Sequence, residues 1–346
     1  MTADRHRRAV PGPERTSGSW DAFSPARPFQ SLWVALGALA AMPGLAATYL
    51  RLVPPTDDVP NLLAAFVPYA VVAYLLSSLF LGIALLRARR RAVLAVATVL
   101  TLTLLSCHLA WLAPLFIPDQ RPASTSTFAL MTLNTRQGEA DPQQVAERAQ
   151  RADVVVLLEA TPTLIDGLQR HGWSERFPYL TGELRGVLGD TVLYSRFPLS
   201  SQAPLPGSEY QTWIANADVP DIGTVRVIAA HPCNPFCGNN RFSTDHQQLR
   251  GAADANLGVP LIVAGDLNAV DDHAPLRALH RDGLVSATDI VGAGWLPTYP
   301  ANRTIPPLLP IDHILVSRFL TATSLSSFDI DGTDHRGLLA EIAGTQ

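Results

Sequence analysis

The stretch "LIVAGDLNAV", Leu261–Val270, passes directly from an apolar run into an acid and an amide two positions apart, Asp266 and Asn268. An apolar run of this length is typical of a buried strand, and Gly, Asp and Asn are typical of the turn that follows one. Polar side chains at strand ends lie at the edge of a sheet, where sites are usually built. The stretch therefore predicts a buried strand with a functional position at its end.

Similar apolar runs recur from Phe128 onward: "FALMTLN", "DVVVLLEA", "DTVLYS", "TVRVIAAH" and "IDHILVS". Two segments between them have helical character, "DPQQVAERAQRA" and "STDHQQLRGAADANL". Each starts at a capping residue, Asp141 or Ser243, and carries apolar residues at helical spacing. This alternation of strands and helices predicts an α/β domain over residues 128–346.

The first third of the chain is far more apolar than the rest. Three runs contain no Asp, Glu, Lys or Arg: Pro28–Leu50, Asn61–Leu86 and Ala92–Pro118. Each is long enough, at about 1.5 Å per residue, to cross the hydrocarbon core of a bilayer. Buried helices of a soluble domain would need polar faces that these runs lack, and a cleaved signal peptide would start nearer Met1. We therefore predict a three-helix transmembrane anchor over residues 28–118.

The placement of arginine predicts the orientation of this anchor. The basic tail of residues 1–27 carries five Arg and the loop "RARRR" carries four, whereas the loop between the first two spans has only Arg51. Because cytoplasmic loops retain positive charge, both basic segments are expected in the cytoplasm. The third helix then leaves the cytoplasm, and the α/β domain is expected on the extracytoplasmic face of the cell membrane. A cytoplasmic domain would need this rule to fail twice.

Residues 119–127, "DQRPASTST", are expected to form a short linker between the anchor and the domain. Even fully extended, they reach only about 30 Å, so the domain must stay near the lipid surface. A site held there meets lipid head groups at a high effective concentration. The lipid bilayer is thus an expected partner of the domain as well as of the anchor.

Eight polar residues of the domain stand where apolar runs end or begin, or in the "TDH" segment near the C-terminus. Hard oxygen ligands of this kind suit Mg²⁺ or Mn²⁺, and no Cys/His cluster has zinc spacing. A divalent ion held by a carboxylate neutralises phosphate charge, while a neighbouring Asp orients a water and a His stabilises the developing charge. The candidates are the carboxylates Glu159, Asp266, Asp312 and Asp334, the amides Asn134 and Asn268, and the imidazoles His231 and His335.

Seven motifs in this order resemble those of the endonuclease/exonuclease/phosphatase superfamily, the fold of DNase I, sphingomyelinases and inositol phosphatases. They are "MTLNTRQG", "VVVLLEAT", "GDTVLYSRFPL", "AAHP", "AGDLNA", "IDHILVS" and "TDHRGLLAEI". The resemblance covers about Phe128 to Ile342 and implies a four-layer α/β sandwich. Each motif alone is weak, because an Asp after a strand is usually a turn residue, but the ordered set is far more specific.

The same resemblance implies a metal site. Glu159 would be the main Mg²⁺ ligand, with Asn134 beside it and Asp334 near the metal. It implies no other cofactor.

The resemblance also implies how the phosphate is attacked. Asp266 would orient the attacking water, and Asn268 would contact the phosphate. His335 would hydrogen-bond a phosphoryl oxygen and be held by Asp312, an acid–imidazole pair that fixes the tautomer and favours the imidazolium. His231 would contact the phosphate from the other side.

Two features leave alternatives open. Many relatives have an Asn in the segment "GNAILSR", where this chain has "GDTVLYSR" with Asp190, which either aids the site or orients a loop. Cys233 and Cys237 stand close together in "HPCNPFCGNN", and an oxidising exterior permits a disulfide between them. Two unpaired thiols are the alternative, since closure depends on the separation of the Cα atoms.

Three membrane helices followed by this domain resemble a narrower branch, the VanJ-type membrane proteins linked with resistance to teicoplanin-class glycopeptide antibiotics. This likeness implies a phosphohydrolase acting on a phosphate-containing envelope lipid or its head group, such as undecaprenyl pyrophosphate. Residues 119–346 hold 16 Arg and 25 acidic residues, a balance of −9, which disfavours nucleic acid as a partner. The alternatives are a nuclease on the outer face and a non-catalytic protein that binds an antibiotic or a wall precursor.

Overall fold

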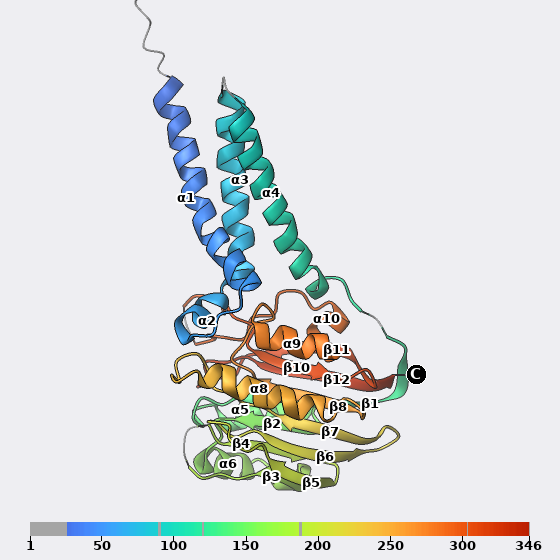
Figure 1. The fold of residues 1–346 in the computed structure, drawn as a ribbon. Coiled ribbons are helices and arrows are strands. Elements are labelled where there is room, and N and C mark those ends of the chain that lie inside the picture. The colour runs from blue at the N-terminus through green and yellow to red at the C-terminus, as the bar shows by residue number, and fades with distance from the viewer. Residues whose placement is uncertain (1–25, 89–90, 120, 187–188, 303, 346) are drawn as a thin grey trace, which may run out of the picture.

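The computed structural model describes residues 26–88, 91–119, 121–186, 189–302 and 304–345 (Figure 1). A bundle of three long helices stands on an α/β domain. The predicted basic tail of residues 1–27 lies outside the described residues except for its last two, and so do Arg89 and Arg90 of the "RARRR" loop.

The bundle consists of α1 (Ala26–Leu52), α3 (Ala70–Arg87) and α4 (Ala92–Leu112), which ends in the short 3-10 helix η2 (Ala113–Leu115). Helix α3 packs against both α1 and α4. The three are long and apolar enough to cross a membrane, and less than a third of each span is buried, 22%, 28% and 17% in turn. The structure therefore has three helices that could span a membrane, as the sequence predicts.

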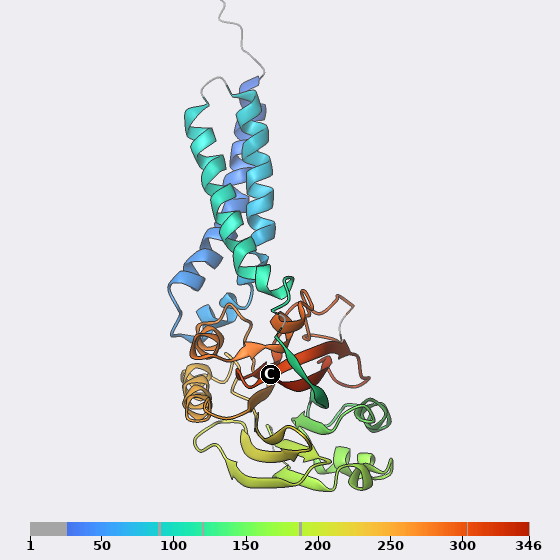
Figure 2. The same cartoon turned by 90° about the vertical axis from the view of Figure 1, so that its right-hand side faces the viewer.

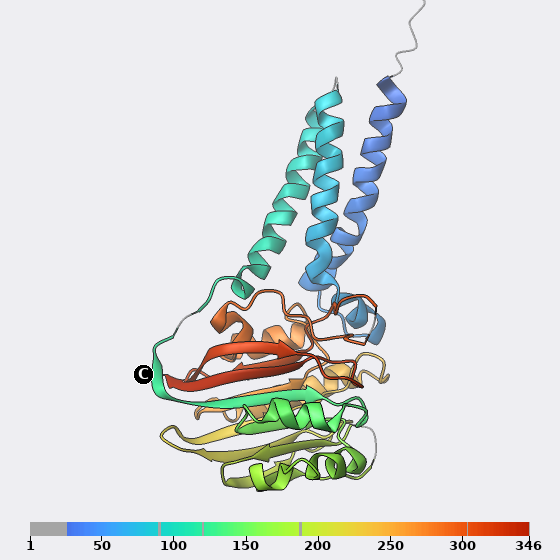
Figure 3. The same cartoon turned by 180° about the vertical axis from the view of Figure 1, so that it is seen from behind.

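The second apolar run differs from the prediction, which treated Asn61–Leu86 as one span. Its first residues belong to the short helix α2 (Asp58–Ala64), which is followed by the 3-10 helix η1 (Val67–Tyr69) and then by α3. Pro68 explains the break, because its ring clashes with the carbonyl of residue 64 in a continuous helix and it has no N–H to donate. Helix α2 instead lies at the base of the bundle, beside the α/β domain (Figure 3).

The α/β domain contains two six-stranded sheets. The first has the order β11-β12-β1-β2-β4-β3 and the second the order β5-β6-β7-β8-β10-β9. The strands of the first sheet are β1 (Ala123–Asn134), β2 (Val154–Leu158), β3 (Tyr179–Gly182), β4 (Thr191–Ser195), β11 (Leu320–Phe328) and β12 (Gly337–Thr345). Those of the second are β5 (Leu199–Pro204), β6 (Trp213–Val219), β7 (Gly223–Ala229), β8 (Leu261–Asp266), β9 (Val285–Ser286) and β10 (Asp312–Val316).

The two sheets pack face to face, and helices cover their outer faces (Figure 2). Alternation along the strands produces these layers, since Leu130 of β1 points into the core between the sheets and Met131 points to the helices. The helices of the first sheet are α5 (Pro142–Ala149), α6 (Pro162–Gln169) and α7 (Trp173–Arg176). Those after β7 are α8 (Arg241–Asp254), α9 (Ala274–Asp282) and α10 (Ala287–Val291). The predicted four-layer sandwich is confirmed.

Two local boundaries differ from the sequence analysis. Strand β1 already begins at Ala123, so residues 123–127, predicted as linker, belong to the strand, and Ala123 and Thr127 pair with β12. Their Thr residues favour strands, and pairing satisfies their backbone groups. Helix α8 begins at Arg241 rather than after Ser243, because the first helical hydrogen bond runs from Thr244 N to Asn240 O. The other predicted cap is found, since Asp141 accepts from Gln144 N at 2.9 Å.

The anchor and the domain contact one another directly. Arg51, in the last turn of α1, forms an ion pair with Asp272 of the domain. Arg277 donates to the carbonyl of Arg51 at 2.9 Å, and the Tyr69 hydroxyl donates to the carbonyl of Leu308 at 2.7 Å. Because these contacts come from two different helical segments, they fix one face of the domain against the base of the bundle.

Candidate active site

Five of the eight predicted site residues lie at the ends of adjacent strands. Asn134 ends β1, and Glu159 directly follows β2, which runs parallel to β1. Asp266 ends β8, where it pairs with Asp312 at the start of the antiparallel β10. His231 follows β7, which runs parallel to β8. The topology of the two sheets thus brings residues that are far apart in the sequence to one edge.

These ends border a cavity of about 270 Å³. It opens beside the anchor, and its lining comes from both sheets and from α2. Asn134 and Asp312 are buried directly behind its wall. The predicted site residues that line it are Glu159, His231, Asp266, Asn268, Asp334 and His335.

Asn134 joins two carboxylates at the floor of this cavity. Its Nδ2 donates to Glu159 Oε1 at 3.2 Å and to Asp266 Oδ2 at 3.0 Å, while its Oδ1 accepts from Arg136 N at 2.9 Å. The other oxygen of Glu159 accepts from Gln137 N at 3.0 Å. In this arrangement Asn134 positions the carboxylates by donating to them.

His335 is held between two buried acids. Its Nδ1 donates to Asp312 Oδ2 at 2.8 Å, and its Nε2 lies 3.7 Å from Asp266 Oδ2. Burial alone lowers the pKa of His335, but Asp312 and Asp266 outweigh it and raise the pKa to about 10. Burial and the charge of Asp312 raise the pKa of Asp266 to about 7, although the His335 imidazolium opposes this. The site therefore combines a cationic imidazole with a carboxylate whose pKa lies near neutrality.

His231 has the opposite character. Its side chain is buried, and burial lowers its pKa to about 3, so the ring is neutral. Its Nε2 lies 3.7 Å from Asp266 Oδ2 and 4.0 Å from Glu159 Oε1, and its ring stacks on Tyr210 at 4.7 Å. Nδ1 finds no hydrogen-bond partner within the described part of the chain. A neutral imidazole can offer the floor of the cavity one donor without adding charge.

Asn268 reaches the site through an unusual backbone conformation. Its φ of 49° and the φ of 53° at Glu159 lie in the left-handed region, which is strained for residues other than glycine. The backbone N–H of Asn268 donates to Asp266 Oδ1 at 2.8 Å, and its Nδ2 donates to the carbonyl of Pro232 at 3.0 Å. Asn134 Nδ2 and Asn268 N thus each donate to a different oxygen of Asp266, and together they fix the orientation of its carboxylate.

The donor set at the floor suits a hard divalent cation, because the carboxylates of Glu159 and Asp266 converge on one amide. A second group of buried side chains, Asp266, Asp312 and His335, has ligand atoms within 4.8 Å of one another. His335 is unsuited to ligation there, since its Nδ1 already donates to Asp312 and its raised pKa keeps both nitrogens protonated. Glu159, with Asp334 also lining the cavity, remains the better ligand candidate.

Asp190 orients a loop and does not line the cavity. It is fully buried and accepts from Gly186 N at 2.8 Å and from Gln211 Nε2 at 2.7 Å. It also forms an ion pair with Arg185 at 3.2 Å. Of the two alternatives for Asp190, the structure supports a role in orienting a loop, through its contacts with Arg185 and Gly186.

Cys233 and Cys237 form a disulfide, with Cα atoms 6.2 Å apart. The bridge closes a five-residue loop, "CNPFC", beside His231. Asn234, Pro235 and Phe236 of this loop line the cavity. The disulfide thus holds one side of the cavity mouth. The sequence left open a disulfide or two unpaired thiols, and the structure contains the disulfide.

Several lining residues were missed by the sequence analysis. Leu62 and Ala65 come from α2 and its end, and were hidden in a run that was predicted to cross the membrane. The ring of Tyr299 lies 4.9 Å from the ring of His335. The polar Asn61 and the nearby Pro68 are the signals that could have separated α2 from the span that follows it.

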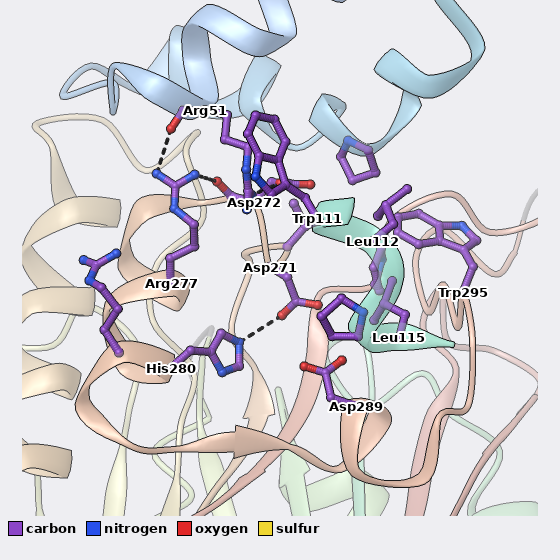
Figure 4. Close-up of a pocket in the computed structure, with 15 residues that line it drawn as sticks. Arg51, Trp111, Leu112, Leu115, Asp271, Asp272, Arg277, His280, Asp289 and Trp295 are labelled. Atoms are coloured by element: carbon purple, nitrogen blue, oxygen red, sulfur yellow. Dashed lines mark hydrogen bonds and ion pairs between the residues drawn. The ribbon is translucent and has the colours of Figure 1, made fainter. Parts of the chain in front are cut away.

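A second cavity, of about 330 Å³, lies where the anchor meets the domain (Figure 4). It contains none of the eight predicted site residues. Its charged groups are largely engaged with one another, as in the ion pairs of Arg51 with Asp272 and of His280 with Asp271, the latter at 3.2 Å. The indole of Trp111 lies under the Arg51 guanidinium, 4.3 Å from it. This cavity is part of the interface between the helical anchor and the α/β domain.

Two packed sheets flanked by helices, with acids, amides and imidazoles at one edge, define a class of phosphoester hydrolases. The chain belongs to the Endonuclease/Exonuclease/phosphatase family, which it matches over residues 131–335. Members of this family hydrolyse phosphate esters and generally use divalent metals. The predicted family is confirmed, and the match spans all eight predicted site residues.

Solved structures of low sequence identity share the fold. Humanized D. rerio TDP2 has a TM-score of 0.52 and 16% identity, over 63% of this chain and 99% of that chain. A Bacteroides vulgatus endonuclease/exonuclease/phosphatase has a TM-score of 0.52 and 15% identity, over 64% of this chain and 100% of that chain. D. rerio TDP2 in complex with a single-strand DNA product has a TM-score of 0.51 and 17% identity, over 63% and 99%. A comparison with curated proteins finds no match.

Proposed function

We propose that this protein is a membrane-anchored, Mg²⁺-dependent phosphohydrolase or phosphodiesterase that acts on a lipid-linked phosphate or pyrophosphate of the cell envelope. The family supplies the reaction class. The proposed substrate class rests on the position of the cavity, whose lining includes Leu62 and Ala65 of the anchor as well as Glu159 and Asp266. A phosphate attached to a lipid reaches such a site without leaving the membrane surface.

The residues of the cavity can divide the reaction among them. Asp266, in its ionised form, accepts the proton of the attacking water, and its orientation is fixed by Asn134 and the backbone of Asn268. His335, kept protonated by Asp312, donates from Nε2 to a phosphoryl oxygen and stabilises the charge that develops there. His231 stays neutral and donates to the phosphate from the opposite wall.

The metal would be held by Glu159, with Asp334 and Asn134 beside it. When bound, Mg²⁺ would neutralise phosphate charge and polarise the phosphoryl group. Glu159 is suited to this role because its carboxylate is partly exposed to the cavity and is oriented by two N–H donors, Gln137 N and Asn134 Nδ2.

We place the domain outside the cytoplasm. Arg87 ends α3 and Arg91 precedes α4, so both lie at the end of the bundle opposite the domain, which supports a cytoplasmic location for that end. The Cys233–Cys237 disulfide is also typical of an oxidising compartment. A reporter that is active only after export should work when fused within residues 119–122 and fail within residues 87–91. The reverse pattern contradicts this orientation.

The proposal extends to a VanJ-type role in glycopeptide resistance, through turnover of a carrier lipid such as undecaprenyl pyrophosphate. The decisive experiment measures Mg²⁺-dependent phosphate release from this lipid in detergent by the purified full chain, with Asp266→Asn and His335→Ala as controls. Release by the wild type alone supports the proposal. Degradation of plasmid DNA instead indicates a nuclease, and resistance that survives Asp266→Asn indicates a binding protein.

A further inference from the structure

The active-site cavity has a polar floor and an apolar mouth. Glu159, Asp266 and His335 form the floor, whereas Leu62 and Phe236 are among the apolar lining residues. A soluble phosphate ester needs only the floor. The apolar character of the mouth therefore has to correspond to another part of the substrate.

One side of the mouth belongs to the membrane anchor. Helix α2 is fixed against the domain by His273, whose Nε2 donates to the carbonyl of Asn61 at 2.8 Å. Ala65, just after α2, is buried against Val270 and Ile311 of the domain. These contacts leave Leu62 half-buried at the cavity, so the wall that it forms is a fixed part of the site.

The other side of the mouth is the disulfide loop. Phe236 is 76% exposed although it is a large apolar residue, and the Cys233–Cys237 bridge holds the loop that presents it. The loop is braced further, because Phe236 N donates to Asn234 Oδ1 at 2.9 Å. Because Phe236 and Leu62 line the same cavity, their side chains give its mouth an apolar surface that an apolar group of a ligand can cover.

The apolar mouth continues into the membrane-spanning part of the chain. Phe66, 43% exposed, directly precedes η1 and α3, where the second membrane segment starts at Val67. Leu63 of α2 is 54% exposed. Exposed apolar residues of α2 and its end thus stand, in the chain, between the cavity-lining Leu62 and the second membrane segment.

We propose that α2 and the disulfide loop form a subsite for the hydrocarbon chain of the substrate. Leu62 and Phe236, at the mouth, contact the hydrocarbon beyond its first isoprene unit, and the rest of the chain follows α2 into the bilayer. The inference rests on the proposed phosphohydrolase function and adds to it the residues that would select an alkyl or prenyl phosphate or pyrophosphate by its hydrocarbon chain. The anchor then contributes to specificity as well as to location.

The test uses the full chain in detergent and prenyl pyrophosphates of increasing length, from dimethylallyl through geranyl to farnesyl. The head group is constant, so only the apolar contact changes along the series. We expect kcat/KM of the wild type to rise with chain length. Leu62→Ser and Phe236→Ser should each reduce the ratio of the farnesyl to the dimethylallyl value by about tenfold, as the loss of one apolar contact predicts.

Val59→Ser is the matched control, because Val59 is 68% exposed on the same helix but does not line the cavity. It should preserve the wild-type ratio. Phe236→Ser keeps the test valid if Leu62→Ser destabilises α2, since an exposed loop residue contributes little to folding.

The other outcomes distinguish failure of the hydrocarbon subsite from failure of the proposed phosphohydrolase function. Three results overturn the subsite but leave a phosphohydrolase. They are hydrolysis that is independent of chain length, an unchanged farnesyl-to-dimethylallyl ratio in both variants, and an equal loss of this ratio in Val59→Ser. The absence of hydrolysis of every member of the series overturns both the subsite and the proposed pyrophosphate substrate.

Discussion

The imidazole of His335 donates from Nδ1 to Asp312 Oδ2 at 2.8 Å, and this contact joins the two sheets of the domain. His335 stands just before β12 of the first sheet, whereas Asp312 is the first residue of β10 in the second. Asp266, which pairs with Asp312 across β8 and β10, lies within 3.7 Å of the same ring. The proton balance of the site therefore depends on how the two sheets pack.

Replacement of Asp266 by Asn removes the proposed general base. We expect kcat/KM to fall roughly 100- to 10,000-fold in Asp266→Asn, the usual size of such an effect. Phosphate release from the proposed lipid substrate is the measurement, with circular dichroism to show that the fold persists. Asp166→Asn, an exposed substitution on α6, should keep wild-type turnover; an equal loss in both variants contradicts the assignment.

The Asp312→Asn variant should move the pH profile of kcat/KM toward lower pH. Asp312 raises the pKa of both His335 and Asp266, so loss of its charge lowers both. The proposed mechanism requires ionised Asp266 and protonated His335, and hence the acidic and alkaline limbs should both shift to lower pH. A profile measured from about pH 5 to about pH 10 tests this. Limbs that keep their positions while the maximum drops indicate a purely structural role for Asp312.

Glu159→Gln should weaken metal binding more than it weakens the fold. A ligand that binds only the native state raises the melting temperature, so Mg²⁺ should stabilise the wild type measurably. In Glu159→Gln we expect this thermal shift to disappear, and the Mg²⁺ concentration for half-maximal activity to rise about tenfold or more. Thermal melts with and without Mg²⁺ provide a readout that is independent of turnover. A full shift in the variant places the ion elsewhere.

His273→Ala should loosen α2 from the domain. The ring of His273 is buried, donates to Asn61 O, and accepts from Val270 N at 2.9 Å, and burial lowers its pKa to about 4, so it is neutral. Its loss leaves two buried backbone groups unpaired, a change of about 1–3 kcal/mol in the free energy of unfolding. We expect a lower denaturation midpoint and faster proteolysis near residue 60. The exposed His171→Ala serves as the control, and an unaltered midpoint for His273→Ala argues against the coupling.

Thiol titration tests the disulfide together with the export of the domain. The chain has three cysteines, and the structure pairs two of them, leaving Cys107 of α4 free. Denatured protein from cells should therefore react with about one equivalent of thiol reagent before reduction and about three after it. Three reactive thiols without reductant would indicate a reducing environment around the domain.

Much of the architecture follows from local features of the sequence. Uninterrupted apolar runs specify the three membrane helices, and alternating strands and helices specify the α/β domain, because these patterns depend on neighbouring residues alone. The polar residues at strand ends were predicted for the same reason. The errors also have local causes, since hydropathy counts apolar side chains and does not detect where Pro68 ends a helix.

The sequence by itself determined the family, the order of the motifs and the eight polar residues of the candidate site. Only the tertiary structure decided that the anchor takes part in the site. His273 and Asn61 are separated by more than two hundred positions, and Leu62 reaches the cavity only because the bundle docks on one face of the domain. Contacts between distant segments depend on the packing of whole layers, which is a property of the folded chain and cannot be inferred from any local pattern.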